Sequence, residues 1–255
     1  MPYVPFREAL GNMEISRGDI LMVTSDITRL MMLQKTNEKS LDTNPLIDAL
    51  QTLVGEEGTL LFPTYNWNFC KGQPFDYYKT PSQTGFFSKV ALQRKDFKRT
   101  RHPIYSFAVW GKYKDFLCSL ENIESFGSDS PFDFLYKQHG KNLIIDVKSV
   151  FTFKLYVEES VGVPYRYIKN FTALYTDELS NCSEKTYSMY VRNLEMDADS
   201  DVQLYMDDLK CEGIAKENMI NGVSFLMVDL YRAFDVLRND ILYNRSRKIA
   251  SYKGQ

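Results

Sequence analysis

Short apolar runs recur along the chain between segments with helical periodicity, and this alternation limits the possible folds more than any other feature of the sequence. Four runs have the length and hydrophobicity of buried strands: ILMV from residue 20, TLLF from residue 59, IYSFAVW from residue 104 and NLIIDV from residue 142. Apolar residues at helical spacing predict helices over residues 27–34, 45–54, 87–94 and 112–120. Strands that alternate with helices are typical of α/β proteins. The sequence therefore predicts an α/β sheet.

The pattern changes after Arg166. Residues 167–175 and 185–194 alternate between apolar and polar side chains, which is typical of half-buried strands, and residues 177–183 form the predicted loop between them. We expect these two strands to pair antiparallel. Residues 221–237 place apolar side chains at helical spacing and predict one C-terminal helix.

The stretch from residue 64 to residue 87 combines weak periodicity with many aromatic side chains, among them Tyr65, Trp67, Phe69 and Phe75. A loop of this length is usually functional or disordered, and the aromatic content argues against disorder. Loops run over the protein surface, where aromatic side chains can line a ligand pocket. The sequence leaves two interpretations open for these side chains, pocket wall and core.

Composition excludes some classes of protein. The chain has 255 residues, which suits one large domain or two small ones, and a net charge of −2, which gives no sign of nucleic-acid binding. No apolar run approaches the roughly 20 residues that span a bilayer. The first 19 residues lack the apolar core of a signal peptide, so we expect a cytoplasmic protein. The four cysteines are scattered without metal-ligand spacing, so we expect reduced thiols and no metal site.

Three polar residues, Thr24, Ser25 and Asp26, stand between the first predicted strand and the first predicted helix. Such residues are good N-caps. The N–H groups at a helix start also bind anions. The Asp26 carboxylate would repel an anion unless it caps the helix instead.

Six segments, taken in order, form a specific set: residues 18–30 (GDILMVTSDITRL), 54–65 (VGEEGTLLFPTY), 75–85 (FDYYKTPSQTG), 99–111 (RTRHPIYSFAVWG), 127–135 (GSDSPFDFL) and 151–166 (FTFKLYVEESVGVPYR). This ordered set resembles the aminoglycoside 3-N-acetyltransferase family. The most specific match is RTRHP followed by Ser106 and Gly111. Together the segments cover most of residues 18–166.

The resemblance implies a three-layer α/β/α fold with a central mixed sheet and a smaller antiparallel C-terminal lobe. It implies a single domain over residues 1–255, in which residues 1–166 bind the cofactor and residues 167–255 form the lobe and the last helix. The implied activity is transfer of an acetyl group from acetyl-CoA to an amine of an amino sugar or aminoglycoside, which is the chemistry of one form of antibiotic resistance. The implied acceptor is a small molecule, and a homodimer is one assembly that the sequence leaves open.

The resemblance also assigns roles to single residues. Thr24 and Ser25 stand where members usually have a His-Ser-Ser run that binds the phosphate arm of the cofactor. Arg99 would hold a phosphate through a bidentate contact, and Ser106 of the same run is assigned to the cofactor as well. His102 would either hydrogen-bond the cofactor or fix its own loop.

Members of the family carry a His-x-x-Glu pair in the segment that matches residues 151–166. The histidine takes a proton from the attacking amine and the glutamate orients the ring, which works because residues three apart share one face of a helix. Here Glu158 pairs back to Leu155 and Glu159 pairs back to Tyr156, so neither register supplies a histidine. Both registers stay open.

Three explanations for the missing base also stay open. Another group of the segment could act, and the candidates are Tyr156, a buried Lys154, and Glu158 or Glu159 through a water molecule. One of the two histidines, His102 or His139, could serve from elsewhere in the chain. The protein could also be an impaired relative that binds coenzyme A or a sugar without efficient transfer, because loss of a general base typically costs about 10²–10⁴-fold in rate.

The charge of the acceptor is a further open question. Residues 195–208 carry six carboxylates and could form an acidic rim for a polycationic aminoglycoside. A nucleotide-linked amino sugar is anionic and would need Arg99, Arg166 or Lys169 nearby.

Overall fold

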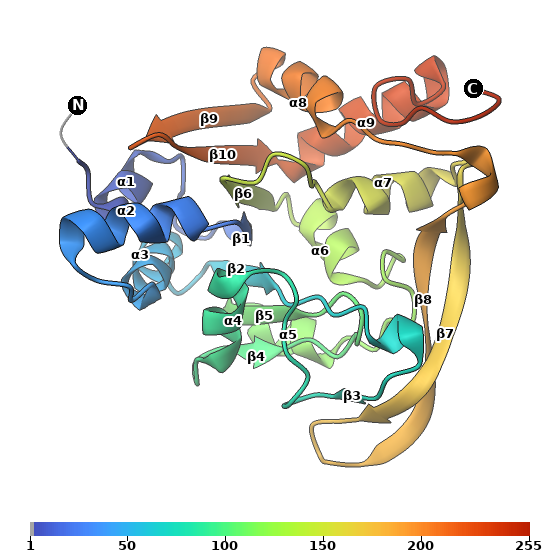
Figure 1. Cartoon of the computed structure of the whole chain (residues 1–255), viewed down its shortest axis with the longest axis horizontal. Coiled ribbons are helices and arrows are strands. Elements are labelled where there is room, and N and C mark those ends of the chain that lie inside the picture. Colours follow the sequence, from blue (N-terminus) through green and yellow to red (C-terminus); the bar gives the residue numbers. More distant parts are fainter. Residues whose placement is uncertain (1–2) are drawn as a thin grey trace.

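The computed structural model describes residues 3–255, so the first two residues of the predicted domain lie outside the described residues. Its centre is a seven-stranded sheet with the strand order β4-β5-β2-β1-β6-β10-β9 (Figure 1). The strands are β1 (Ile20–Ser25), β2 (Thr59–Pro63), β4 (Lys98–Arg99), β5 (Phe107–Gly111), β6 (Lys141–Ile145), β9 (Ala215–Ile220) and β10 (Val223–Asp229). β1 is parallel to β2 and β6, whereas β5 and β10 are antiparallel to their neighbours. The predicted mixed central sheet is confirmed.

Helices cover both faces of this sheet. One face packs against α1 (Phe6–Ala9), α2 (Thr28–Glu38), α3 (Asn44–Val54) and α4 (Phe86–Gln93). The other packs against α5 (Lys114–Ser119), α6 (Pro131–Lys137), α7 (Phe153–Val161), α8 (Val202–Cys211) and α9 (Leu230–Asn244). Three short 3-10 helices are η1 (Leu10–Asn12), η2 (Phe69–Lys71) and η3 (Leu194–Met196). No helix within residues 3–255 combines the length and the hydrophobicity that crossing a bilayer requires.

The apolar runs of the sequence form strands that are buried on both faces. In β1, Leu21 and Val23 point into the core beneath α1 to α4, while Ile20 and Met22 point into the core on the opposite face. Successive side chains of a strand face opposite sides, so a strand between two helical layers needs a continuous apolar run. The predicted three-layer α/β/α architecture is confirmed, and this burial is its physical cause.

A smaller sheet has the order β3-β7-β8, with β3 at Phe75–Asp76, β7 at Arg166–Thr176 and β8 at Cys182–Arg192. β7 and β8 pair antiparallel along all 11 residues of each strand, as predicted. This long hairpin runs down one side of the molecule (Figure 1). β3 is parallel to the far end of β7, which attaches the 64–87 loop to the smaller sheet.

The prediction of one helix over residues 221–237 is wrong. Residues 223–229 form strand β10, and the helix begins only at Leu230, where the Asp229 side chain accepts a hydrogen bond from the Arg232 N–H. Asn221 and Gly222 both have positive φ, 51° and 78°, and join β9 to β10. Asn-Gly is a strong signal for a two-residue hairpin, and it outweighs the helical spacing. Two strands from the C-terminal half thus extend the main sheet, and the division of the domain at residue 166 stays a prediction.

The end of β5 generates a test of the fold. Gly111 has φ of +102°, and a Cβ there would collide with the Gly58 carbonyl oxygen and lie 2.9 Å from the Thr59 Cα. We expect Gly111→Ala to lower the free energy of unfolding by more than ~2 kcal/mol, because this collision adds to the ~1–2 kcal/mol cost of a left-handed backbone. Gly18→Ala is the matched control, since Gly18 has φ of +88° and nothing within 4 Å of its added Cβ. Equal losses in urea denaturation of the two variants would contradict the collision.

Candidate active site

A cavity of about 420 Å³ lies beyond the carboxyl ends of the three parallel strands β1, β2 and β6. Ser25 ends β1 and Pro63 ends β2, while Val147 follows β6, and all three residues line the cavity. The strand order places β2 on one side of β1 and β6 on the other. Open α/β sheets bind ligands at the carboxyl edge, at the point where consecutive parallel strands are added on opposite sides of a central strand. The cavity therefore occupies the expected binding position, and its volume suits a small molecule.

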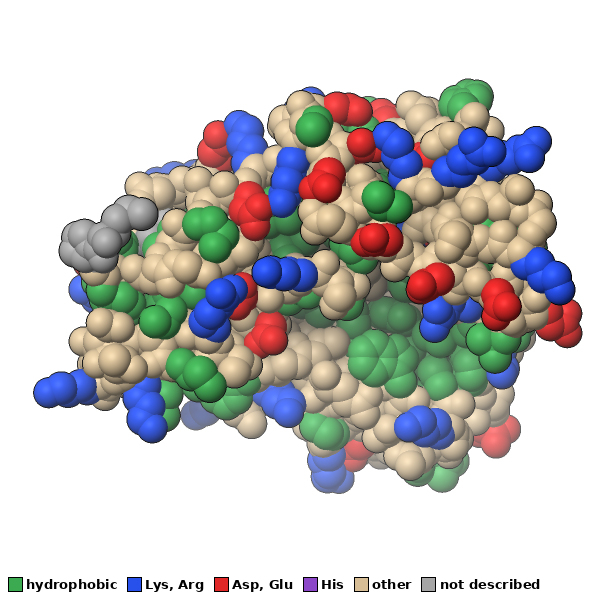
Figure 2. Space-filling view, turned by 45° about the horizontal axis from the view of Figure 1, so that its top comes forward, with side chains coloured by type: hydrophobic (Ala, Val, Ile, Leu, Met, Phe, Trp, Pro, Cys, Tyr) green, Lys and Arg blue, Asp and Glu red, His purple; other side chains and the backbone are tan. Residues whose placement is uncertain are grey.

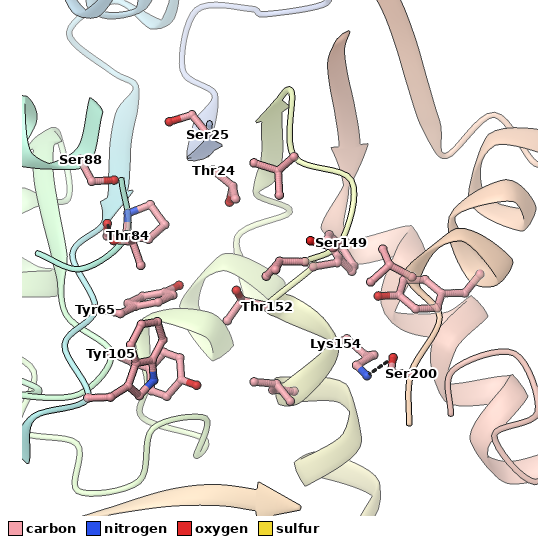
Figure 3. A pocket seen from close by; sticks show the side chains of 18 of the residues that line it. Thr24, Ser25, Tyr65, Thr84, Ser88, Tyr105, Ser149, Thr152, Lys154 and Ser200 are labelled. Atoms are coloured by element: carbon pink, nitrogen blue, oxygen red, sulfur yellow. Dashed lines mark hydrogen bonds between the residues drawn. The ribbon is translucent and has the colours of Figure 1, made fainter. Parts of the chain in front are cut away.

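Distant segments form the walls of this cavity. Tyr65 and Tyr105 stand on one side, and Lys154 and Ser200 stand on the other (Figure 3). Trp67 and Tyr205 also line the cavity. The Tyr65 and Tyr105 rings are 4.6 Å apart at their centroids. Figure 2 shows a hollow in one face of the molecule where hydrophobic side chains gather, with charged side chains around it.

The aromatic side chains of the 64–87 loop divide between the two interpretations that the sequence left open. Tyr65 and Trp67 line the cavity. Phe69 and Phe75 are almost fully buried in the hydrophobic core. One loop thus supplies both the wall of the cavity and the side chains that anchor this wall.

Several buried polar atoms of the cavity have no partner. Among the residues the structure describes, Ser25 Oγ, Tyr65 Oη and Tyr205 Oη are buried and make no hydrogen bond, and all three residues line the cavity. Buried polar groups in proteins are nearly always hydrogen-bonded. A bound ligand with amide, hydroxyl or phosphate groups would supply the missing partners.

A charged cluster stands beside the cavity, and Glu158 is at its centre. This carboxylate is fully buried, and Lys154 Nζ lies 3.3 Å from its Oε1. Arg166 Nε lies 2.6 Å from its Oε2 without the alignment of a hydrogen bond, and the Tyr165 hydroxyl donates to Oε1 at 3.1 Å. Lys154 Nζ also donates to Ser200 Oγ at 2.7 Å. A buried carboxylate needs such partners because its desolvation is costly.

The cluster places positive charge, and no negative charge, on the cavity wall. Lys154 and Arg166 line the cavity, and no carboxylate does so within the part of the chain that the structure describes. Burial lowers the pKa of Lys154, and the positive charge of Arg166 lowers it further, while the Glu158 carboxylate opposes both.

The orientation of helix α7 distinguishes the two pairings considered for the His-x-x-Glu motif, Leu155 with Glu158 and Tyr156 with Glu159. Leu155 lines the cavity, and the carboxylate three residues later is the buried Glu158. Tyr156 does not line the cavity, and its hydroxyl donates to Asp133 Oδ1 at 3.0 Å. Glu159 does not line it either, although burial and the nearby Glu124 carboxylate raise its pKa to about 7. Only the register of Leu155 and Glu158 faces the cavity.

His102 lies away from the cavity and is built into its own loop. Its Nδ1 accepts hydrogen bonds from the Ile104 and Tyr105 N–H groups, and its Nε2 lies 3.2 Å from the Ile123 carbonyl oxygen. Burial lowers the pKa of His102 to about 4, so the ring is neutral at pH 7. Of the two roles weighed for this histidine, the contacts match fixing the loop.

Arg99 and Ser106 lie inside the protein and not on the cavity wall. The Arg99 guanidinium donates to Ser106 Oγ at 3.0 Å and to the carbonyl oxygens of Thr80 and Thr64 at 2.6 and 3.2 Å. It also stacks on the Phe75 ring at 4.7 Å. The structure therefore does not bring these two residues to a cofactor in the cavity, because their polar groups hold the 64–80 loop together.

The residues at the end of β1 differ in their contacts: Asp26 bonds to the backbone at the start of α2, whereas Thr24 and Ser25 line the cavity. Asp26 Oδ1 accepts a hydrogen bond at 3.0 Å from the N–H of Thr28, the first residue of α2, so this carboxylate is engaged by the backbone before the helix. This bond lowers the pKa of Asp26. Thr24 and Ser25 line the cavity, and only Ser25 Oγ is unpaired, since the Thr24 hydroxyl donates to Asn142 Oδ1.

Sequence analysis did not identify Ser200 and Tyr205 as site residues. They come from the acidic 195–208 segment, whose carboxylates do not line the cavity. Asp208, for example, pairs with Lys248. The sequence marked this segment only by its carboxylates, whereas the side chains that line the cavity are Ser200, Val202 and Tyr205.

Comparison with known proteins agrees with the fold. The sequence profile of the aminoglycoside 3-N-acetyltransferases matches residues 22–241. The SPbeta prophage-derived aminoglycoside N(3')-acetyltransferase-like protein YokD of Bacillus subtilis (strain 168) is 29% identical over 49% of this chain. The matched part spans about half of that relative, 54% of its length.

Two solved structures illustrate the shared fold. Aminoglycoside acetyltransferase AAC(3)-Xa is 16% identical, with a TM-score of 0.76 and 91% of each chain covered. AAC-IIIb, solved as a binary complex with CoASH, is 15% identical, with a TM-score of 0.73, 98% of this chain and 96% of that chain covered.

The buried His102 generates a test in acid. The unfolded chain takes up a proton near pH 6.5, whereas the folded chain does so only near pH 4. We expect the stability that the neutral ring confers to be complete above pH 6.5 and to be lost as the pH falls to about 4, by ~3 kcal/mol. His102→Asn should flatten this part of the curve of unfolding free energy against pH. His139→Asn, at an exposed histidine, should leave it unchanged, and equal curves for the two variants would contradict the assignment.

Proposed function

This chain belongs to the aminoglycoside 3-N-acetyltransferase family, and on that premise we propose that it transfers an acetyl group from acetyl-CoA to an amine of a small amino sugar. As a member of this family it is an acyl-CoA-dependent N-acetyltransferase, and acetyl-CoA is its acyl donor. The observation that carries the proposal for this chain is the cavity at the carboxyl edge of β1, β2 and β6, whose buried hydroxyl groups lack partners.

The cavity suits the thioester arm of the donor. A pantetheine arm is a narrow chain with amide and carbonyl groups, and the unpaired Ser25 and Tyr65 hydroxyls could bond to such groups. Ser25 and Tyr65 are therefore the proposed hydrogen-bonding contacts to acetyl-CoA, and Thr24 lines the cavity beside Ser25. Arg99 and Ser106 support the loop that carries Tyr65 and Trp67, and His102 supports the loop that carries Tyr105, so the contribution of these three residues is indirect.

The proposed reaction is direct attack by the acceptor amine on the thioester. No cysteine lines the cavity within residues 3–255, and neither histidine does. One lining serine, Ser200, lies beside a basic group, but it accepts from Lys154 Nζ at 2.7 Å and donates its own proton to the Ile249 carbonyl oxygen, so Lys154 does not activate it as a nucleophile. A covalent acetyl-enzyme is not required.

One observation favours an alternative function. Leu155 lines the cavity, and the family resemblance predicts a histidine at this position, so the protein could bind coenzyme A or a sugar without efficient transfer. Whether another side chain accepts the proton in place of this histidine decides between acetyl transfer and binding without transfer.

The proposal predicts acceptor-dependent release of free thiol. Purified protein with acetyl-CoA should release coenzyme A only when an amino-sugar acceptor is present, and mass spectrometry should find the product heavier by one acetyl group. An N-acetylated form of the same sugar is the matched control, because its nitrogen cannot attack. Calorimetric binding of coenzyme A with no thiol release across a broad acceptor panel would support the alternative function.

The charge of the cavity predicts the charge of the acceptor. Arg166 lines the wall without a lining carboxylate in the described chain, so a polycation loses electrostatic energy on entering. We expect kcat/KM for a nucleotide-linked amino sugar to exceed that for an aminoglycoside at least tenfold at low ionic strength. The ratio should decrease only modestly in 0.5 M salt, because the Arg166 side chain is 11% exposed and salt screens such a charge weakly. A preference for the aminoglycoside at both ionic strengths would contradict the anionic acceptor.

A further inference from the structure

The proposed reaction lacks an assigned proton acceptor. The acceptor amine must lose a proton as it becomes an amide. Position 155 is leucine, and His102 and His139 do not line the cavity. Tyr156 and Glu159 do not line it either, and Glu158 is fully buried behind Lys154 and Arg166.

Lys154 occupies the neighbouring position on α7 and does line the cavity. Its side chain is 7% exposed, and its Nζ lies 3.3 Å from Glu158 Oε1. The same Nζ lies 2.7 Å from Ser200 Oγ (Figure 3). The Ser200 hydroxyl donates to the Ile249 carbonyl oxygen at 2.8 Å, so Ser200 Oγ accepts from Lys154. A neutral amine has two N–H bonds and one lone pair. The two acceptors take the two N–H bonds, and the lone pair is left without a partner in the described protein.

The surroundings of Lys154 lower the pKa of its amine and so shift it toward this neutral form. The charged and titratable groups around it are Glu158 on its own helix, Tyr165 and Arg166 at the start of β7, Arg192 on β8, and Asp201 and Tyr205 at the start of α8. Burial and the two guanidinium groups lower the pKa of Lys154, and the Glu158 carboxylate opposes them. Arg166 balances the Glu158 charge at 2.6 Å, which weakens this opposition.

We propose that Lys154 is the general base of this acetyltransferase and replaces the histidine of the family. This inference rests on the proposed function. The amine nitrogen forms a bond to the acetyl carbonyl carbon, and the bond between that carbon and the sulfur breaks. The amine proton passes to Lys154 Nζ and then to the departing sulfur. The products are the amide and the free thiol, and Lys154 returns to its neutral form.

Two substitutions separate this role from a structural one. Lys154→Arg keeps a cation beside Glu158 and Ser200 but cannot lose its proton at accessible pH. Lys154→Met removes the charge and keeps an unbranched chain. We expect both variants to lower kcat by about 10²–10⁴-fold, with coenzyme A affinity by calorimetry within threefold of the wild type. Lys112→Met, at an exposed lysine paired with Glu57, is the matched control and should keep full activity.

A double variant tests whether the base can be moved to the adjacent position. In Lys154→Met/Leu155→His, the freed Oε1 of Glu158 can orient an imidazole at position 155. We expect at least a tenfold recovery of kcat over Lys154→Met. The rising limb of kcat/KM against pH should move toward pH 6.5, the range of histidine. A structural role for Lys154 would give neither the recovery nor this shift.

The outcomes for the base and for the function are distinct. If the wild type releases thiol with an amino-sugar acceptor and Lys154→Arg does so at the same rate and with the same pH profile, Lys154 is not the base and the proposed function stands. If the wild type binds coenzyme A but acetylates no acceptor, the proposed function fails and the assignment of Lys154 fails with it.

Discussion

The ion pairs of Glu158 determine the geometry of the rest of the site. This carboxylate has no contact with solvent, and it joins Lys154 of α7 to Arg166 at the start of β7. Loss of one partner from a buried pair typically costs ~3–5 kcal/mol, so the chain is constrained to keep α7, β7 and the Ser200 loop together. The cavity wall next to α7 is therefore fixed by compensation of charge as well as by packing.

The opposite wall of the cavity depends on a second buried cation, whose charge is stabilised without a carboxylate of the described chain. Arg99 is almost fully buried and is paired with no carboxylate among the described residues; its N–H groups bond to carbonyl oxygens of the 64–80 loop and to Ser106. The ring of Phe75 faces its guanidinium. Delocalised charge and five donors suit arginine to this position. The Arg99 guanidinium binds the backbone of the 64–80 loop. The loop is therefore held in place, and it keeps Tyr65 and Trp67 at the cavity wall.

The sequence predicts some of these features well and others not at all, for physical reasons. Leu21 and Met22 point into the cores on opposite faces of the sheet. Both faces of β1 must therefore be apolar, and the continuous run ILMV identifies it as a buried strand. The β9–β10 hairpin was missed because the apolar residues of β10 also fit a helix, and only the Asn221-Gly222 turn reveals the hairpin. The resemblance located α7 at the site, but the register needed the orientation of Leu155. Tyr205 reaches the cavity through tertiary packing alone, and no local pattern marks it.

The buried carboxylate also accounts for the residue types that stand beside it in this chain. In a His-x-x-Glu pair, one carboxylate oxygen is needed to orient the imidazole. Here Lys154 lies at Oε1 of Glu158 and Arg166 lies at Oε2, so both oxygens are engaged by basic side chains. A histidine at position 155 would compete with Lys154 for the same oxygen, and a leucine does not. In this chain the carboxylate that would orient a ring therefore holds an amine at the cavity instead.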